Sequence, residues 1–475
     1  MSKQSIRPSR MVNRRRLLAV GAIGSATVVA LAGCGETQVI TKEVVVKEEV
    51  IKEVEVIKEV VVEKIVTQVE APAQLAAVEI KMWSFNYTPH NESWGMMIYD
   101  FQNENPGVTI DLQPQDEPIV KYTAGFASGQ AGDIVSIHGQ AAQQFILAGV
   151  IDPLDSALPG WEKRFFSAVM TPYVHQGRPY GVPLTNNTPG IGMIVNLDHF
   201  DEAGVEVVEQ FESWEQTWEI AQRMTVKDGD TITRSGLNVR EVHALQYVLG
   251  NMLEQGQPYY DAQSGEFFIN TPAGHAGIQL FVDAIHKHKV DSMDLEDAFN
   301  ALAKGGAAMG EIWIDYIPFA KAQFPEGRFG FTVRAPIAGD KTIVVGEGSW
   351  GASVNAQTQG DAKDAAMAFV NYLSQPETMM TWVKAQNALP STPDLLDHPY
   401  YKSAEGKWLR GALRVLPDSV YEGDVGFISK LNFDIAWPAM QAAMAKQISV
   451  EEAAERIDKE GAVQLQEYRE LAGTA

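Results

Sequence analysis

The amino-acid sequence predicts an α/β protein built on a mostly parallel sheet with helices on both faces. Apolar and polar residues alternate from Val78 to Trp83, which is typical of a half-buried strand. Strands are expected at 78–83, 108–112 and 133–137. Helices are expected at 92–104, 119–129 and 140–148. Because strands and helices alternate along the chain, the helices are expected to act as crossovers between parallel strands.

Ligands of such sheets bind beyond the carboxyl ends of the strands. In this chain the loops in that position are Ser84–His90, Asp116–Ile119 and His138–Gln140. They are therefore the first place where a binding site is expected.

The remainder of the chain returns to the same two kinds of element. A hairpin is expected at 173–183, and capping boxes at Ser213–Gln216 and Ser449–Glu452 predict two helix starts. Further strands are expected at 192–196, 307–309, 330–333 and 349–354. Further helices are expected at 213–224, 242–255, 271–286, 294–304, 361–373, 376–385 and 449–471.

The N-terminus has the layout of an export signal. Three arginines, Arg14 to Arg16, precede a short apolar run that ends at Cys34, the single cysteine of the chain. The segment Leu31–Cys34 resembles the lipobox of bacterial lipoproteins, which implies cleavage after residue 33 and a lipid on Cys34. The Arg14-Arg15 pair also resembles a twin-arginine signal, so both Sec and Tat export stay open. The expected location is the extracytoplasmic face of the membrane, with a lipid anchor.

Charge and cysteine content exclude several classes of function. The chain of 475 residues has a net charge of −23, and removal of residues 1–33, with six basic residues and no acid, leaves −29. This balance argues against nucleic-acid binding, which requires a basic face. With Cys34 lipidated, no thiol remains for a disulfide or a cysteine-ligated metal. No cofactor is expected.

Residues 37–70 form a low-complexity segment of Lys-Glu pairs among Val and Ile. Val50, Val54, Ile57 and Val61 have the spacing of a coiled-coil seam, whereas the β-branched content favours strand. We interpret residues 34–77 as a charged stalk, with an oligomerisation coil as the alternative. Ala71-Pro72-Ala73 marks the start of the folded part.

Six phrases in sequence order resemble one family, the extracellular solute-binding proteins of ABC importers, in the sugar-binding group. The phrases lie at 101–108, 128–134, 148–155, 180–183, 304–309 and 365–377. Gly132 stands where the family usually has proline. The resemblance covers residues 78 to about 471.

The resemblance implies a two-lobed, class II periplasmic-binding-protein-like fold with a hinge between the lobes. Lobe 1 would comprise 78–182 and 347–397, and lobe 2 would comprise 183–346 and 398–475. The implied function is binding of a carbohydrate between the lobes and its delivery to the ABC permease, without catalysis, by a monomeric domain. Alternatives are the same fold with a polyol phosphate or a cation, or a surface adhesion lipoprotein.

Candidate ligand contacts combine aromatic plates for sugar faces with polar groups for hydroxyls. The aromatic candidates stand at strand ends or beside glycines and are Trp83, Phe85, Tyr87, Trp313, Tyr316, Trp350 and Trp437. The polar candidates are Asp116, Gln140, Asn186, Asn187 and Glu311. Core packing is the commoner role for any aromatic residue and solvation for any acid.

An enzymatic function has little support in the sequence. No nucleophile elbow, P-loop or HExxH motif occurs. His286 and His288 diverge on a helix and are not expected to hold a metal together. A glycosidase would need a carboxylate pair such as Glu311 and Asp315. We therefore predict no catalytic residue and no metal site.

Overall fold

The computed structural model describes residues 38–44, 62–68, 75–186, 191–261, 264–346, 348–423 and 430–472. The chain divides into two compact units, Met1–Gln74 and Leu75–Ala475. In the first unit, β1 (Gln38–Val44) and β2 (Val62–Gln68) form an antiparallel pair. These two stretches follow the strand preference of their β-branched residues, whereas Val50, Val54, Ile57 and Val61, which carry the coiled-coil spacing, lie outside the described residues. Cys34 and the export signal lie outside the described residues.

The second unit contains a five-stranded sheet with the order β4-β3-β5-β15-β8. The strands are β3 (Val78–Phe85), β4 (Val108–Gln115), β5 (Ile134–His138), β8 (Val182–Pro183) and β15 (Trp350–Val354). Strand β3 pairs in parallel with β4 and β5, as the sequence predicted. Strand β15 pairs antiparallel with β5 and β8, so the sheet is mixed. This strand arrives from a distant part of the chain and not through a local crossover helix.

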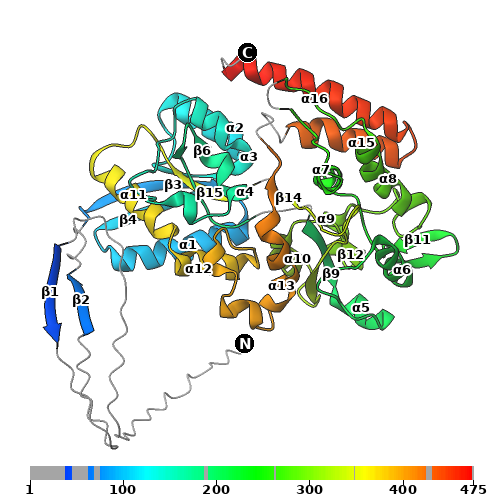
Figure 1. The fold of residues 1–475 in the computed structure, drawn as a ribbon, viewed down its shortest axis with the longest axis horizontal. Coiled ribbons are helices and arrows are strands. Elements are labelled where there is room, and N and C mark those ends of the chain that lie inside the picture. The colour runs from blue at the N-terminus through cyan, green and yellow to red at the C-terminus, as the bar shows by residue number, and fades with distance from the viewer. Residues whose placement is uncertain are drawn as a thin grey trace, which may run out of the picture. The chain divides into compact units, whose positions relative to one another are not determined.

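Five of the longer helices in the described residues accompany this sheet, and the assembly is called lobe 1 below (Figure 1). They are α1 (Thr88–Glu104), α2 (Pro118–Ser128), α3 (Gly139–Leu147), α11 (Gly360–Leu373) and α12 (Pro376–Gln386). Helix α1 begins at a proline-containing turn and buries Trp94, Met97, Ile98 and Phe101. These positions follow the i, i+3, i+4, i+7 pattern of an amphipathic helix, which explains why α1 packs on the sheet.

A second, antiparallel sheet has the order β12-β9-β13. Its strands are β9 (Gly192–Asn196), β12 (Met309–Gly310) and β13 (Phe329–Val333). The helices around it are α5 (Leu197–Ala203), α6 (Trp214–Met224), α7 (Ala244–Glu254), α8 (Pro272–His286), α9 (Ala298–Leu302), α10 (Ile317–Gln323), α15 (Trp437–Met444) and α16 (Val450–Ala472). This assembly is called lobe 2, and Figure 1 shows α15 and α16 beside α7 and α8.

Both predicted helix starts are confirmed, with a reciprocal capping box at Ser449 and only its N-cap half at Ser213. The backbone N–H of Gln216 donates to Ser213 Oγ, and Ser449 and Glu452 exchange side-chain and backbone hydrogen bonds. The helix expected at 294–304 is shorter than predicted. It begins only after Asp297, whose carboxylate accepts the N–H of Asn300 and so sets the helix start.

In the described residues the chain passes between the two lobes three times. It leaves the five-stranded sheet after β8, returns between β13 and β15, and leaves again after α12. Strand β14 (Val345–Gly346) lies on the second passage and pairs in parallel with β16 (Val420–Tyr421). The shorter elements are α4 (Ser167–Met170), β6 (Val174–His175), β7 (Arg178–Pro179), β10 (Val226–Asp228), β11 (Thr231–Arg234), α13 (Arg410–Val415) and a π-helix at Leu431–Ala436.

Candidate functional site

A cavity of about 600 Å³ lies between elements of lobe 1 and lobe 2. This volume falls within the range of small-molecule sites. Lobe 1 contributes Phe85, Tyr87, His90, Pro118, Ile119, Tyr122, Ser136, Ile137, His138, Gln140, Ala141, Phe145 and Trp350. Lobe 2 contributes His243, Phe299, Trp313, Asp315, Phe319 and Phe433.

The lobe 1 wall is formed where strand ends meet. Phe85 ends β3, His138 ends β5, and Trp350 begins β15 directly opposite His138. Because β15 runs antiparallel to β5, its first residue lies at the same sheet edge as the carboxyl ends of β3 and β5. The cavity therefore occupies the position at which sheets of this kind bind ligands.

Aromatic rings line the cavity as a continuous series of contacts. The ring centroids of Trp350 and Phe85 are 5.3 Å apart, and those of Phe85 and Tyr87 are 6.2 Å apart. Tyr87 then contacts Phe319 of lobe 2 at 6.3 Å. We call the series Trp350, Phe85, Tyr87, Phe319, Phe299, Trp313, His243 and Phe433 the aromatic belt.

The belt continues through lobe 2 with similar spacing. Phe319 contacts Phe299 at 4.8 Å, and Phe299 contacts Trp313 at 5.9 Å. His243 contacts Trp313 at 5.4 Å and Phe433 at 5.5 Å, in both cases edge to face. His243 Nδ1 lies 2.9 Å from the Glu241 carboxylate, which can only accept, so this ring nitrogen is the donor. The orientation of the imidazole is thereby fixed.

The charges of the cavity wall are few. Among the described residues that line it, Asp315 is the one acidic side chain and none is Lys or Arg. Burial, with a smaller contribution from His138, lowers the pKa of His90 to about 3. His90 is therefore neutral at physiological pH. Burial and the negative charge of Asp315 raise the pKa of Tyr87, which keeps the phenol protonated.

Five of the predicted candidates line the cavity, namely Phe85, Tyr87, Gln140, Trp313 and Trp350. Six others lie elsewhere in the described chain, namely Trp83, Asp116, Asn186, Glu311, Tyr316 and Trp437. Asn187 lies outside the described residues.

Trp83 and Tyr316, which were also predicted to contact the ligand, are held by packing in or against the protein core instead. The Trp83 indole donates to Gln113 Oε1, and a Cβ added at Gly125 would come within 2.4 Å of that indole. Trp83 thus fills the space over α2. Tyr316 was expected one helical turn after Trp313, but Trp313 has extended backbone and precedes a 3-10 turn. Tyr316 is consequently buried, and its hydroxyl donates to the Phe299 carbonyl.

The remaining candidates also lie away from the cavity lining. Asp116 is exposed and accepts from Asn86 Nδ2 at 2.8 Å, and Asn186 is buried with its amide 3.5 Å from Ser419 Oγ. Trp437 packs against the lobe 2 core. Glu311 is 2% exposed, and neither carboxylate oxygen has a hydrogen-bond partner among the described residues. Burial raises the pKa of Glu311 well above its usual range, which favours the protonated form of the side chain.

Sequence reasoning missed several residues of the cavity wall: His90, His138, His243, Phe299, Phe319 and Phe433. His90 and His138 lie in the loops expected at the carboxyl ends of the strands, so their position was a usable signal. The other four are in helices and connections of lobe 2. Their approach to the cavity depends on how the two lobes meet, which leaves no local pattern.

The profile of the bacterial extracellular solute-binding proteins matches residues 96–407. The chain belongs to this family. The resemblance inferred from the six phrases is thereby confirmed. Binding proteins of Brucella abortus and Brucella suis are 23% identical over 312 residues, which cover 63% of this chain and 73% of each relative.

Solved structures of the same kind confirm the predicted two-lobed fold. The maltose/maltodextrin-binding domain of Bdellovibrio bacteriovorus, bound to maltotriose, has a TM-score of 0.63 at 18% identity and covers 82% of this chain and 100% of its own. The cyclic α-maltosyl-1,6-maltose binding protein of Arthrobacter globiformis has a TM-score of 0.69 at 17% identity with coverage of 82% and 100%. UgpB of Mycobacterium tuberculosis, in complex with glycerophosphocholine, has a TM-score of 0.66 at 18% identity with coverage of 82% and 99%.

Among the residues that the structure describes, no group of three or more His, Cys, Asp or Glu side chains is arranged to hold a metal ion. None of the described helices is both long and apolar enough to cross a bilayer. The family is extracellular, which agrees with the export signal inferred from the sequence.

Proposed function

We propose that this protein is the receptor of an ABC importer and binds a carbohydrate between its lobes for delivery to the permease. The observation that carries the proposal is the aromatic belt, which extends across both lobes inside a cavity of about 600 Å³. The faces of a sugar ring are lined by C–H groups, and stacking on aromatic rings removes both apolar surfaces from water. Phe85, Tyr87, Trp313 and Trp350 are the proposed stacking residues.

The mechanism of the proposed receptor is hinge closure. A solute that contacts Trp350 in lobe 1 and Trp313 in lobe 2 has more contacts in the closed state than in the open state. It therefore shifts the population toward closure, and the permease recognises the closed form. We propose hinges near 182–183, 345–346 and 397–398, with lobes 78–182 plus 347–397 and 183–346 plus 398–475.

The N-terminal features complete the proposal. Lipidation of Cys34 would anchor the receptor at the extracytoplasmic face, and residues 34–77 would act as a stalk. The family consists of binding proteins, and catalysis is not part of the proposal. The carboxylate pair considered for a glycosidase has no support in the cavity, because Glu311 is buried and does not line it.

An organic cation is the second candidate solute. Cations bind favourably over aromatic faces, and Asp315 is the one charged acid among the described lining residues. A phosphate-bearing solute is less well matched, because the described lining residues include neither Lys nor Arg.

A ligand screen separates these solutes. Thermal unfolding of the mature chain would be followed with maltotriose, cycloalternan, tagatose, choline and glycerophosphocholine, which include ligands named for similar structures. We expect a carbohydrate to raise the melting temperature, with the dissociation constant confirmed by calorimetry. Stabilisation by choline alone would favour the organic cation. Stabilisation by none of the sugars would contradict the carbohydrate proposal.

A further inference from the structure

The carboxylate of Glu422 is fully buried and is surrounded by side-chain amides from three segments. Its Oε1 accepts from Gln140 Nε2 at 2.9 Å. Its Oε2 accepts from Gln246 Nε2 at 2.8 Å and from Asn432 Nδ2 at 3.4 Å. A buried carboxyl group is costly unless hydrogen bonds satisfy it, and these amides supply such bonds to both of its oxygens.

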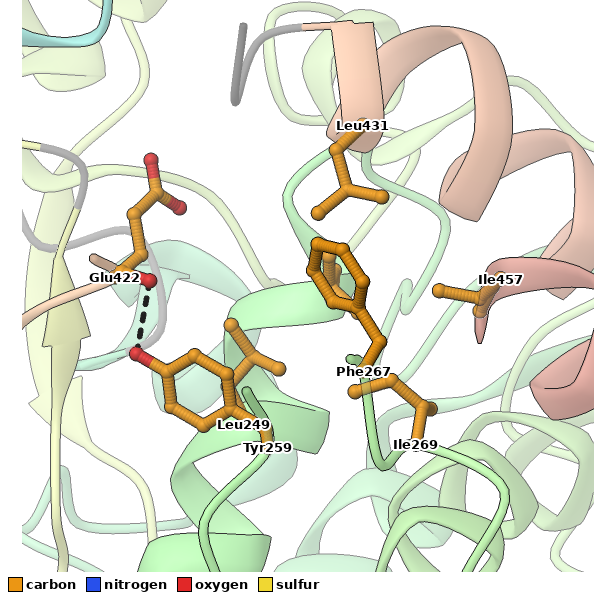
Figure 2. Close-up of a pocket in the computed structure, with 8 residues that line it drawn as sticks. Leu249, Tyr259, Phe267, Ile269, Glu422, Leu431 and Ile457 are labelled. Carbon is orange, nitrogen blue, oxygen red and sulfur yellow. Dashed lines mark hydrogen bonds between the residues drawn. The ribbon is translucent and has the colours of Figure 1, made fainter. Parts of the chain in front are cut away.

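The backbone around Glu422 is held as well. The Tyr259 hydroxyl donates to the Glu422 carbonyl at 2.9 Å, as Figure 2 shows. A small apolar cavity of about 10 Å³ adjoins this contact, and the Glu422 carboxylate points away from Phe267, Leu431 and Ile457 (Figure 2). The side chain therefore turns from the apolar interior of lobe 2 toward its amide partners.

One of the three amide contacts joins the two lobes. Gln140 lies in the first turn of α3, after β5 of lobe 1, and lines the cavity. Gln246 belongs to α7 and Asn432 to the π-helix, both in lobe 2 with Glu422. Asn432 precedes Phe433, the last ring of the aromatic belt. Glu422 thus links a polar residue of the lobe 1 wall to the segment that presents a belt residue in lobe 2.

We propose that Glu422 is a positioning residue for solute recognition, which holds the Gln140 amide at the cavity wall and couples it to lobe closure. The proposal rests on the receptor function proposed above. A carboxylate accepts and does not donate, so the Gln140 amide must direct Nε2 toward Glu422. This contact fixes the orientation of the amide and the position of its carbonyl oxygen. Because the bond crosses from lobe 1 to lobe 2, closure of the lobes favours it.

The variant Glu422→Gln tests this role with little change in shape. In the wild type, one carboxylate oxygen accepts from Gln140 and the other accepts from Gln246 and Asn432. A glutamine has a single carbonyl oxygen and one NH₂ group, so it can accept on one of these two sides only. We expect its carbonyl to stay with the two lobe 2 donors and its NH₂ to face Gln140. Gln140 must then flip or withdraw. The charge-assisted bond between the lobes is replaced by a weaker neutral bond or is lost.

Two exchanged pairs provide a rescue and a matched control. In Gln140→Glu with Glu422→Gln, the new carboxylate at 140 accepts from the amide at 422, so a charge-assisted bond between the lobes is restored. In Gln246→Glu with Glu422→Gln, the restored bond lies inside lobe 2. The two double variants have the same amino-acid composition, and they differ only in which hydrogen bond of residue 422 is restored.

Lobe separation can be measured without a solute on the full chain. With Cys34 replaced by Ser the chain has no cysteine, and spin labels can be attached at Tyr99→Cys on α1 and Val463→Cys on α16, which are 65% and 60% exposed. We expect Glu422→Gln to reduce the population with a short distance between the two spin labels about fivefold, because a charged hydrogen bond is replaced by a neutral one. The 140/422 exchange should restore the population to within about twofold, and the 246/422 exchange should not.

A maltotriose titration of the same variants provides the second measurement, in which the dissociation constants should follow the same order. Unchanged distances in all variants, or equal rescue by both exchanges, would show that Glu422 is only structural and overturn the proposal. If maltotriose and the other sugars fail to bind the wild type while the distances change as expected, the carbohydrate assignment fails and the positioning role stands.

Discussion

Trp350 and Phe85 stack almost in parallel, with 5° between their ring planes and 5.3 Å between centroids. Trp350 also contacts His90 and His138 at 5.6 Å and 5.2 Å in edge-to-face arrangements. These contacts hold the indole in place before a solute arrives. A preorganised ring loses little freedom on binding, so more of the stacking energy is available as affinity.

Replacing Trp350 or Trp313 by Ala is therefore expected to weaken solute binding strongly. A stacked indole should contribute about 1–3 kcal/mol, or roughly ten- to a hundredfold in affinity. Both side chains are only partly buried, so the loss of stability should be smaller than for a core tryptophan. Calorimetric titration with a ligand from the screen measures the first effect, and thermal unfolding of the free protein measures the second.

Trp218 of α6 is the matched control, because it is 8% exposed and packs on Trp214 and His288 in lobe 2. Trp218→Ala should lower stability by about 3–5 kcal/mol and leave the affinity of the folded protein unchanged. If Trp313→Ala and Trp350→Ala behave like this control, the two rings are core residues and not ligand contacts.

His90 should make the protein sensitive to mild acid. Burial lowers the pKa of His90 to about 3, below the value of about 6.5 expected in the unfolded chain. Between these values the unfolded state binds a proton that the folded state does not, so the stability contribution present above pH 6.5 is lost as the pH falls. From pH 6.5 to 5 the loss is on the order of 2 kcal/mol.

The substitution His90→Phe tests this explanation, because phenylalanine keeps an aromatic ring beside Tyr87 and Trp382. Urea unfolding of the wild type and the variant would be compared at pH 7, 6 and 5. We expect the variant to lose less stability across this interval. If the free energy of unfolding falls equally with pH in both proteins, His90 is excluded as the source of the acid sensitivity.

Glu311 should act in the opposite direction. Burial raises its pKa well above the usual range, so the folded state keeps a proton that the unfolded state releases once the pH exceeds about 4.5. The stability that Glu311 contributes is therefore full below this pH and is lost as the pH rises toward the folded-state pKa. Glu311→Gln should raise the melting temperature at pH 7, with a difference that shrinks toward pH 4. A lower melting temperature of the variant at pH 7 would contradict a protonated Glu311.

The strand ends could be predicted because they follow local rules. Phe85 and Trp350 stand at the ends of the strands expected at 78–83 and 349–354, and ligands of such sheets bind at that edge. Phe319 and Phe433 could not be predicted in this way. They reach the cavity from α10 and from the π-helix, and their place depends on how lobe 2 meets lobe 1.

Local spacing failed where the backbone changed its periodicity. Trp313 and Tyr316 would share a face in a regular α-helix, but Trp313 has a ψ of 150° and only Ile314–Tyr316 form a 3-10 turn. The two rings consequently diverge, with Trp313 at the cavity and Tyr316 in the core. The burial of Glu311 also results from the local course of the backbone. It follows β12 directly, and its backbone N–H donates to Asn238 inside lobe 2.

The membrane anchor can be tested through its single cysteine. The segment Leu31–Cys34 predicts cleavage before Cys34 and lipidation of its thiol. The Cys34→Ser protein cannot receive the lipid, so it should be released or should keep its signal and migrate as a larger precursor. Fractionation of cells with a carbonate wash, combined with the mass of the mature N-terminus, measures both outcomes. Globomycin should give the same precursor in the wild type, because it blocks the lipoprotein signal peptidase. Retention of a processed Cys34→Ser protein in the washed membrane would show that another feature of the chain provides the anchor.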